Sequence, residues 1–370
     1  MKGPLRRFFH AAVAHLEAGA DRVGDLLALG EGHGERVRIV PFAGYRNAER
    51  VRLRGRVLRN EGESPRRPGL IDRLAAVIDI YDSAELAGVA VRLEGYGLEA
   101  EAVSDPEGYF VFDLQLAETG LPDRTQWDSV RLSAPGRQAQ AAVVPAPVLA
   151  PGADGHWGVI SDIDDTVIET GATDLRANWR RILLHAPSER LAVPGAAALY
   201  RAIARDHAAP ARPFFYVSSS PWNLYGFLAE FMEMNAIPHG AMFLKDWGID
   251  RDTLLMASHD ALKLAAIREI LGFYPEFRFL LVGDNGERDV HIYAAIVAEF
   301  GARVAAVFIR DVTGTCRQGE KAELLRGIEA AGVPTFCGGG FDDAVAVFTA
   351  LELDRPREAA KAVAEPEGPR

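Results

Sequence analysis

The stretch that decides the fold is Gly158-Val159-Ile160-Ser161-Asp162-Ile163-Asp164-Asp165-Thr166-Val167-Ile168. A short apolar run ends in two carboxylates, Asp162 and Asp164, and a hydroxyl, Thr166. This pattern predicts a buried parallel strand whose carboxyl end opens into a loop of oxygen ligands. Two ionised carboxylates about 4 Å apart repel by roughly 4 kcal/mol at an effective dielectric near 20. We therefore interpret the loop as a cation site or an acid/base pair, and Mg²⁺ is the natural cation because it prefers hard oxygen ligands.

Two other interpretations of this stretch remain. An EF-hand calcium loop would need glycine where Val167 stands, and a helix rather than a strand would precede it. Acidic residues that only cap the following helix are the second alternative. Polar residues at other predicted strand ends, described below, favour a functional site over both.

Length and composition predict a two-domain globular protein. The chain has 370 residues, about twice what one core usually needs. It is 48% hydrophobic and 25% charged, and its formal net charge is −11. Nucleic-acid binding requires a basic face, so we expect no nucleic-acid partner.

Cysteine usage and hydropathy predict a cytoplasmic protein. Cys316 and Cys337 are too few for a disulfide framework, and we interpret them as small apolar residues in a reducing compartment. No run of 18 uncharged apolar residues occurs, so no transmembrane span is expected. Residues 1–30 are predicted to form an amphipathic helix rather than a signal peptide, because acidic residues follow Phe8-Phe9 at helical spacing. Whether that helix packs on the next domain or contacts a membrane surface peripherally stays open.

Residues 31–147 are predicted to form an all-β domain. Runs of alternating apolar and polar residues are separated by turn signals such as Ser104-Asp105-Pro106-Glu107-Gly108. The predicted strands are 36–42, 51–59, 89–93, 98–103, 109–114, 129–133 and 139–144. Such a set indicates a small antiparallel sandwich, and it resembles the transthyretin-like modules appended to many enzymes.

An α/β domain is predicted at 148–352, after a linker rich in proline and glycine at 145–157. Apolar strands at 157–161, 214–217, 279–282 and 304–309 alternate with helices at 195–206, 222–235, 259–271, 289–300 and 320–331. This alternation predicts a parallel sheet covered by helices on both faces, with ligands at the carboxyl ends of its strands. Residues 353–370 are predicted to be a disordered tail.

Polar residues stand at two further predicted strand ends. Ser218-Ser219-Ser220-Pro221 follows one strand, and three hydroxyls before a helix suit phosphoryl oxygens. Which of the three serines contacts phosphate is left open. Gly283-Asp284-Asn285-Gly286-Glu287-Arg288-Asp289 follows another strand and brings two more carboxylates to the same edge. Lys263 lies between these motifs, in the first turns of an amphipathic helix.

These motifs, in this order, resemble those of the haloacid-dehalogenase (HAD) phosphohydrolases: Asp162/Asp164/Thr166, Ser218, Lys263 and Asp284/Asp289. The resemblance implies a Rossmann-like parallel sheet. Residues 169–194 are long enough for a small helical flap but too short for a sealing cap domain. Lys245 is the rival for the motif lysine, but Lys263 is preferred because its helix leads directly into the strand that bears Asp284.

The residues between the motifs are similar to the catalytic domain of the actin-patch-associated, Mg²⁺-dependent phosphatidate phosphatases. The distinctive stretches are Ser220-Pro221-Trp222-Asn223-Leu224 and the acidic loop 283–289, and Ile309-Arg310-Asp311-Val312 also fits. The similarity covers roughly residues 157–349. It implies hydrolysis of phosphatidic acid to diacylglycerol and phosphate.

The resemblance also implies catalytic roles. Asp162 is expected to attack phosphorus and form an aspartyl-phosphate. Asp164 is expected to protonate the leaving group and then to activate water. Ser218 and Lys263 are expected to bind phosphoryl oxygens, while Thr166 holds the loop.

For the metal, the resemblance implies Mg²⁺ held by the Asp162 carboxylate, the Asp164 main-chain carbonyl and Asp284. Asp289 is expected to support the metal shell through water or Lys263. Asp165 is expected to have no catalytic role.

Two alternatives to the lipid phosphatase are kept. The first is a HAD phosphatase that acts on a soluble or protein phosphomonoester. The second is a scaffold that retains the site but binds a partner through the sandwich domain. A site without a sealing cap favours a bulky substrate, such as a lipid head group or a protein.

Overall fold

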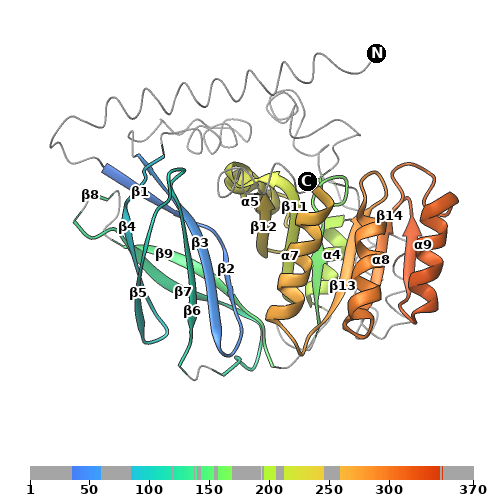
Figure 1. Ribbon diagram of the computed structural model, residues 1–370, viewed down its shortest axis with the longest axis horizontal. Coiled ribbons are helices and arrows are strands. Elements are labelled where there is room, and N and C mark those ends of the chain that lie inside the picture. Colours follow the sequence, from blue (N-terminus) through green and yellow to red (C-terminus); the bar gives the residue numbers. More distant parts are fainter. Residues whose placement is uncertain are drawn as a thin grey trace, which may run out of the picture.

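The computed structural model describes residues 36–59, 85–117, 120–136, 138–139, 143–153, 157–168, 193, 196–205, 212–245, 259–341 and 344. These residues form two β-sheets, one in each half of the described chain (Figure 1). The predicted N-terminal helix and C-terminal tail lie outside the described residues, as does the predicted flap apart from Val193.

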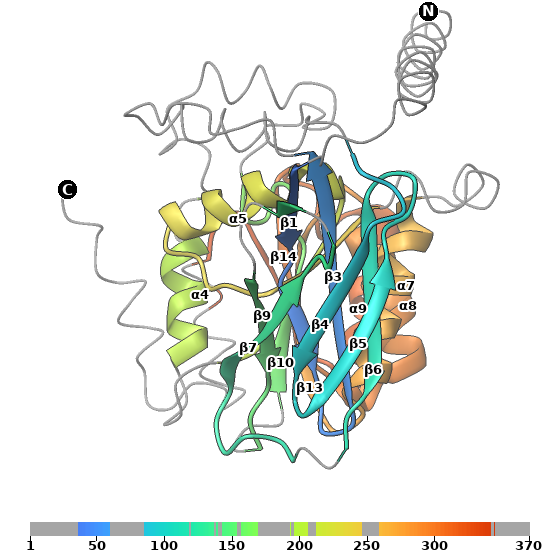
Figure 2. The ribbon, with the colours of Figure 1, turned by 90° about the vertical axis from the view of Figure 1, so that its left-hand side faces the viewer.

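The first half is a mixed β-sheet of nine strands. They are β1 (Arg36–Pro41), β2 (Gly44–Arg46), β3 (Arg50–Arg59), β4 (Ala90–Gly95), β5 (Leu98–Val103), β6 (Tyr109–Gln115), β7 (Gln126–Ser133), β8 (Gln138–Ala139) and β9 (Val144–Ala150). Their order is β5-β4-β7-β9-β2-β3-β1-β8, with β6 paired to β3. Most pairs are antiparallel, as predicted, but β1 with β8 and β2 with β9 run parallel. Figure 2 looks onto this sheet, with the helices of the second half behind it.

Alternation along these strands explains their shared core. In β3 the residues Val51, Leu53 and Val57 are buried inside the β domain, while the intervening arginines lie on the other face. The turn before β6 forms as the sequence predicts: Asp105 Oδ1 accepts the main-chain N–H groups of Glu107 and Tyr109, and Gly108 has a φ of 79°.

The second half is a six-stranded parallel sheet with helices on both faces. Its strands are β10 (Trp157–Ser161), β11 (Phe214–Pro221), β12 (Ala241–Lys245), β13 (Arg278–Asp284), β14 (Val304–Arg310) and β15 (Thr335–Gly338). Its helices are α4 (Ala196–Arg205), α5 (Tyr225–Met234), α7 (His259–Phe273), α8 (Asp289–Phe300) and α9 (Gly319–Ala330), with short 3₁₀ turns at Trp222–Leu224 and Gly301–Arg303.

The strand order β12-β11-β10-β13-β14-β15 is that of a doubly wound fold. The order reverses between β10 and β13, so their carboxyl ends flank the position where such folds bind ligands. All pairs are parallel, and the apolar strands face a core on each side. Helices α4 and α5 cover one face, and α7, α8 and α9 cover the other (Figure 1).

Two predictions are wrong, and three short strands were missed. Residues 145–150 of the segment expected to be a linker lie in β9, in which Pro145 and Pro147 pair with β7 on one side while β2 reaches only Val148 and Leu149 on the other. Proline is compatible with such a strand because its missing N–H is not needed on the open side. The short strands β2, β12 and β15 were not predicted.

The second wrong prediction concerns the cysteines. Cys316 and Cys337 form a disulfide rather than standing as separate apolar residues. Strand β15 pairs with β14 so that Cys337 lies opposite Ile309, and the loop after β14 brings Cys316 to the same level. The two Cα atoms are 6.5 Å apart, which a disulfide spans.

Candidate active site

The predicted functional residues meet at the carboxyl edge of the parallel sheet. Asp162 follows β10, the serines occupy the end of β11, and Asp284 ends β13. Asp289 begins α8, and Lys263 projects from the second turn of α7. All of these side chains are buried. Parallel pairing of β10 with both β11 and β13 brings the three strand ends together.

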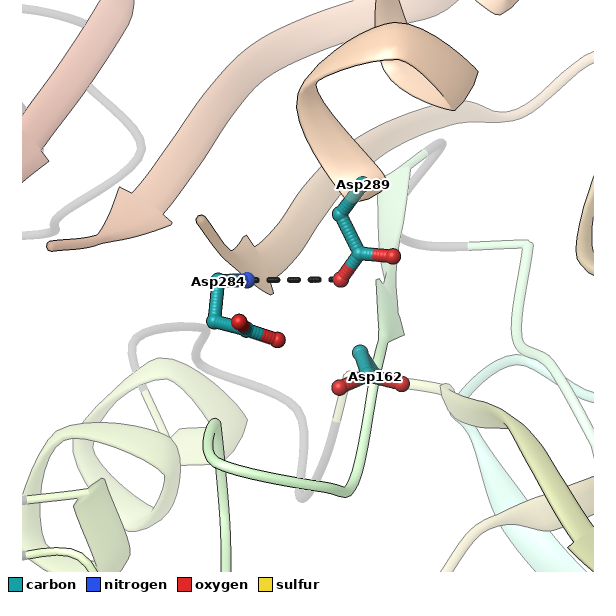
Figure 3. A group of neighbouring side chains, drawn as sticks. All are labelled: Asp162, Asp284 and Asp289. Carbon is teal, nitrogen blue, oxygen red and sulfur yellow. Dashed lines mark hydrogen bonds between the residues drawn. The ribbon is translucent and has the colours of Figure 1, made fainter. Parts of the chain in front are cut away.

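The centre of the site is a cluster of three carboxylates. Asp162, Asp284 and Asp289 each offer an oxygen atom within 4.8 Å of the others (Figure 3). Asp289 Oδ2 accepts the main-chain N–H of Asp284 at 3.3 Å, which ties the start of α8 to the end of β13. Gly283 leaves the room for this contact, since a Cβ there would lie 2.4 Å from Asp289 Oδ2.

Lys263 is the cation of the cluster. Its Nζ donates to Asp162 Oδ1 at 2.6 Å, to Asp289 Oδ1 at 2.9 Å and to Glu287 Oε2 at 2.9 Å. Lys263, the lysine preferred from the sequence, therefore lies in direct contact with the carboxylate cluster. The rival Lys245 lies in β12, at the point where that strand pairs with Pro221.

Burial and charge set the acidity of these groups. Burial raises the pKa of Asp162 well above its usual value; the Lys263 ammonium opposes this rise, and Asp289, Glu287 and Asp284 reinforce it. Burial likewise raises the pKa of Asp289, and it raises the pKa of Asp284 to about 7. Burial alone would lower the pKa of Lys263, but the surrounding carboxylates outweigh it and raise that pKa. The ammonium is thus held charged.

The cluster fits a divalent metal ion. Asp284 Oδ1 accepts the main-chain N–H groups of Gly286 at 2.5 Å and Glu287 at 3.0 Å, which orients the carboxylate. Asp284 Oδ2 is buried and has no hydrogen-bond partner among the described residues. An all-carboxylate donor set with an unused buried oxygen is what a hard cation binds.

The second predicted acid faces the serines. Asp164 Oδ2 accepts a hydrogen bond from Ser218 Oγ at 2.9 Å, and Ser220 Oγ lies 3.5 Å from the same oxygen. Ser218 Oγ also accepts the main-chain N–H of Ser220 at 2.9 Å. Ser219 Oγ is buried without a partner in the part of the chain that the structure describes. Thr166 Oγ1 donates to Asp162 Oδ2 at 3.3 Å, in keeping with a loop-holding role.

The loop from Ile163 to Ile168, which contains Asp164, is a tight turn. Val167 and Ile168 both donate main-chain N–H groups to the Ile163 carbonyl, and Asp165 N–H donates to Ile168 O at 2.7 Å. Asp165 has a φ of 53°, in the left-handed region that side chains with a branched Cβ avoid. Asp, like Asn, tolerates this conformation, so the residue suits the turn.

Two structural supports of the site were not assigned roles from the sequence. Arg310 Nη1 donates to the Asp165 carbonyl at 2.7 Å, so the end of β14 holds the Asp162–Asp164 loop. Asn285 Oδ1 accepts the main-chain N–H groups of Val312 and Thr313, and its Nδ2 donates to Asp311 Oδ1 at 2.5 Å. The Ile309–Val312 stretch fits the resemblance found in the sequence. Residue spacing does not reveal that its residues support the loops of the site.

The family comparison places the similarity in this half of the chain. Residues 157–311 match the family model described as the catalytic domain of phosphatidate phosphatase APP1. Phosphatidate phosphatase APP1 of Saccharomyces cerevisiae is 34% identical over 154 residues, which are 41% of this chain and 25% of the yeast protein. The uncharacterized protein C29B5.04c of Schizosaccharomyces pombe is 27% identical over 219 residues, 58% of this chain and 35% of that protein.

The chain thus spans about a quarter to a third of the length of the curated relatives it matches. The resemblance to phosphatidate phosphatases of this kind, inferred from the motifs, is confirmed for residues 157–311. Among solved structures, the carbohydrate acetylesterase XAC1771 from Xanthomonas citri aligns over 79% of this chain and 74% of its own, at 10% identity and a TM-score of 0.25, which carries no argument.

The left-handed turn residue gives a first prediction. Replacing Asp165 with Val is expected to destabilise the fold by about 1–3 kcal/mol, because a β-branched residue is strained at a φ of 53°. Replacing it with Asn, which tolerates this conformation, should cost less. Chemical denaturation of both variants measures the difference. Equal losses would mean that the side chain, not the backbone, matters here.

The buried carboxylates give a second prediction. Asp284 keeps its proton up to about pH 7 in the folded protein but loses it near 3.8 when unfolded. The contribution of Asp284 to stability in the presence of a chelator should therefore be greatest below about pH 4 and fall as pH rises from about 4 to 7. A divalent cation such as Mg²⁺ needs the ionised ligands, so the rise in melting temperature that it causes should grow over the same range.

The control for this prediction is Asp284→Asn, measured with and without the cation at each pH. The substitution should flatten both the pH dependence and the cation effect. A cation effect that is equal at pH 5 and pH 8, or that survives in Asp284→Asn, would contradict the site.

Proposed function

We propose that this protein is a Mg²⁺-dependent phosphatidate phosphatase with a HAD-like catalytic domain. It would hydrolyse phosphatidic acid to diacylglycerol and inorganic phosphate. The observation that carries the proposal is the position of Asp162, which accepts a hydrogen bond from Lys263 and belongs to the carboxylate cluster, beside Asp164 and its serines. The match of residues 157–311 to the APP1 catalytic domain supports the lipid substrate.

Asp162 is the proposed nucleophile. An Asp162 carboxylate oxygen attacks phosphorus, the ester P–O bond breaks, and an aspartyl-phosphate forms. Lys263 Nζ donates to this carboxylate at 2.6 Å and Thr166 Oγ1 donates to it at 3.3 Å. These two hydrogen bonds restrict the orientation of the carboxylate. The Lys263 ammonium opposes the rise in the pKa of Asp162 that burial causes, and so favours the ionised, nucleophilic carboxylate.

Asp164 is the proposed general acid and base. It gives its proton to the leaving alkoxide and then takes one from the water that attacks the aspartyl-phosphate, which restores Asp162 and releases phosphate. The Ser218 hydroxyl lies 2.9 Å from the Asp164 carboxylate. A phosphoryl group bound by Ser218 would therefore sit next to the proton donor.

Lys263 and the serines are the proposed phosphoryl-binding groups. Ser218 and Ser220 both direct their hydroxyls to the Asp164 side of the site, which favours them over Ser219 for this role. The metal ligands would be Asp162, the Asp164 carbonyl and Asp284, with Asp289 acting through Lys263. A bound Mg²⁺ would neutralise charge on the phosphoryl oxygens and orient them.

We also propose the domain assignment made from the sequence: a helix at 1–30, a transthyretin-like sandwich at 31–147, a catalytic domain at 148–352 and a tail at 353–370. Because β9 continues to Ala150, the proposed sandwich boundary moves a few residues toward β10. In the described parts of the chain, no helix has the length and apolar character to cross a membrane. Cytoplasmic location with peripheral contact at the lipid surface is part of this proposal.

Loss of the nucleophile is the third prediction. Asp162→Asn should lower Mg²⁺-dependent phosphate release by about 10⁴-fold or more, as removal of a nucleophile does in other enzymes. Asp165→Asn is the matched control, since it makes the same chemical change three residues away in the same loop. Equal activity in the two variants would reject Asp162 as the nucleophile. Circular dichroism checks that both are folded.

Substrate class is the fourth prediction. We expect phosphate release from phosphatidic acid in detergent micelles to exceed release from a panel of soluble phosphomonoesters, and a chelator to abolish both. Turnover of soluble esters or phosphopeptides alone would support the catalytic mechanism but reject phosphatidic acid as the substrate. No turnover of any ester with added Mg²⁺ would favour the scaffold alternative, in which the sandwich domain binds a partner.

A further inference from the structure

We infer that the β domain positions the phosphate-binding serines, and that Phe42 and Arg54 are positioning residues of the active site. The inference rests on the proposed function, because that function assigns Ser218 and Ser220 to phosphate. It concerns residues outside the segment 157–311 that matches the catalytic family model.

The serines occupy an irregular part of β11. Val217 pairs with Phe243 and Pro221 pairs with Lys245, so β11 advances four residues where its neighbour β12 advances two. The three serines between these points leave the regular ladder, as strands often do beside active sites. Their position is therefore fixed from the two ends of the irregular segment rather than by strand pairing along it.

The carboxyl end of this segment is held by the β domain. Trp222, the next residue after Pro221, stacks on Phe42 with ring centroids 4.7 Å apart and planes 11° apart. The guanidinium of Arg54 lies 5.8 Å from the centroid of the Trp222 ring, and Phe42 N–H donates to the Arg54 carbonyl. The indole thus contacts two residues of the β domain whose main chains are hydrogen-bonded to each other.

A second contact secures the same place. The Tyr225 ring lies 4.4 Å from Phe42, and its hydroxyl accepts the main-chain N–H of Ala43 at 2.7 Å. Phe42 is almost fully buried and belongs to the apolar core on the α4/α5 face of the parallel sheet. Any shift of Phe42 would be transmitted to Trp222 and so to the serines.

Tyr45, three residues further on, provides an internal control. It enters the core on the opposite face of the same sheet, against Phe215 and Phe273, and its hydroxyl donates to Glu269 at 2.6 Å. Phe42 and Tyr45 therefore both attach the β domain to the α/β half, but only Phe42 stacks on the residue that ends the serine segment.

The test compares Phe42→Leu with Tyr45→Leu. Both should lower the melting temperature because each removes a buried ring from the junction. Only Phe42→Leu should lower kcat on phosphatidic acid, by about tenfold, since small displacements of catalytic groups have effects of this order or larger. It should also weaken the binding of inorganic phosphate, measured by calorimetry with Mg²⁺ present. Equal changes in both variants, or none in either, would overturn the inference.

A double-mutant cycle tests the route through Trp222. If Phe42 acts through the indole, its effect on kcat should largely disappear in a Trp222→Leu background, whereas the effects of Tyr45→Leu and Trp222→Leu should add. Arg54→Met should also lower kcat, and this loss should likewise disappear in the Trp222→Leu background. Additive effects of Phe42→Leu and Trp222→Leu would contradict the route.

Hydrogen exchange gives a readout that needs no substrate. The peptide that contains residues 218–224 should lose protection in Phe42→Leu and keep it in Tyr45→Leu. If wild-type protein turned over no ester while the exchange result held, the proposed function would fail and the positioning of the serine segment would stand. If wild-type protein were active and the peptide exchanged alike in both variants, the positioning inference alone would fail.

Discussion

One buried ammonium group faces more negative charge than it can balance. Lys263 contacts Asp162 at 2.6 Å and Asp289 at 2.9 Å, while Asp284 belongs to the same carboxylate cluster. An unpaired carboxylate in a protein interior costs several kcal/mol, so the folded chain must either protonate part of the cluster or bind a further cation. The raised pKa values of Asp162 and Asp284 reflect the first state. The buried, unpartnered oxygen of Asp284 is available for the second.

The fold concentrates these charges by strand order. Reversal of the order between β10 and β13 puts Asp162 and Asp284 on adjacent strands, and loops from the neighbouring strands then support them. Arg310, at the end of β14, donates to the carbonyl of Asp165 on the far side of β13. Such main-chain supports suit a site whose side chains repel one another, because they hold the loop without taking up the carboxylate oxygens that must bind metal and substrate.

The sequence predicted the parts of the structure that depend on long patterns. Runs of apolar residues predict β10, β11, β13 and β14, and the rule that parallel strands end at one edge places their acidic and hydroxyl residues together. It failed where elements are short or locally atypical: β2, β12 and β15 have three to five residues, too few to show a period, and the prolines of β9 imitate a linker. It could identify Lys263 only through the order of motifs, because a helical lysine is usually exposed. Contacts to main-chain carbonyls, such as that of Arg310, leave no pattern in the sequence.

The junction of the two halves explains why the β domain is more than an attached module. Phe42 and Tyr45 enter the cores on opposite faces of the parallel sheet, next to β11 and the sheet's edge strand β12. On one face the contact of Phe42 with Trp222 joins the β domain to the end of the serine segment, whereas Tyr45 joins it to Phe215 and Phe243 on the other face. A change that loosened the Phe42 side of the junction would therefore alter the active site before it separated the domains.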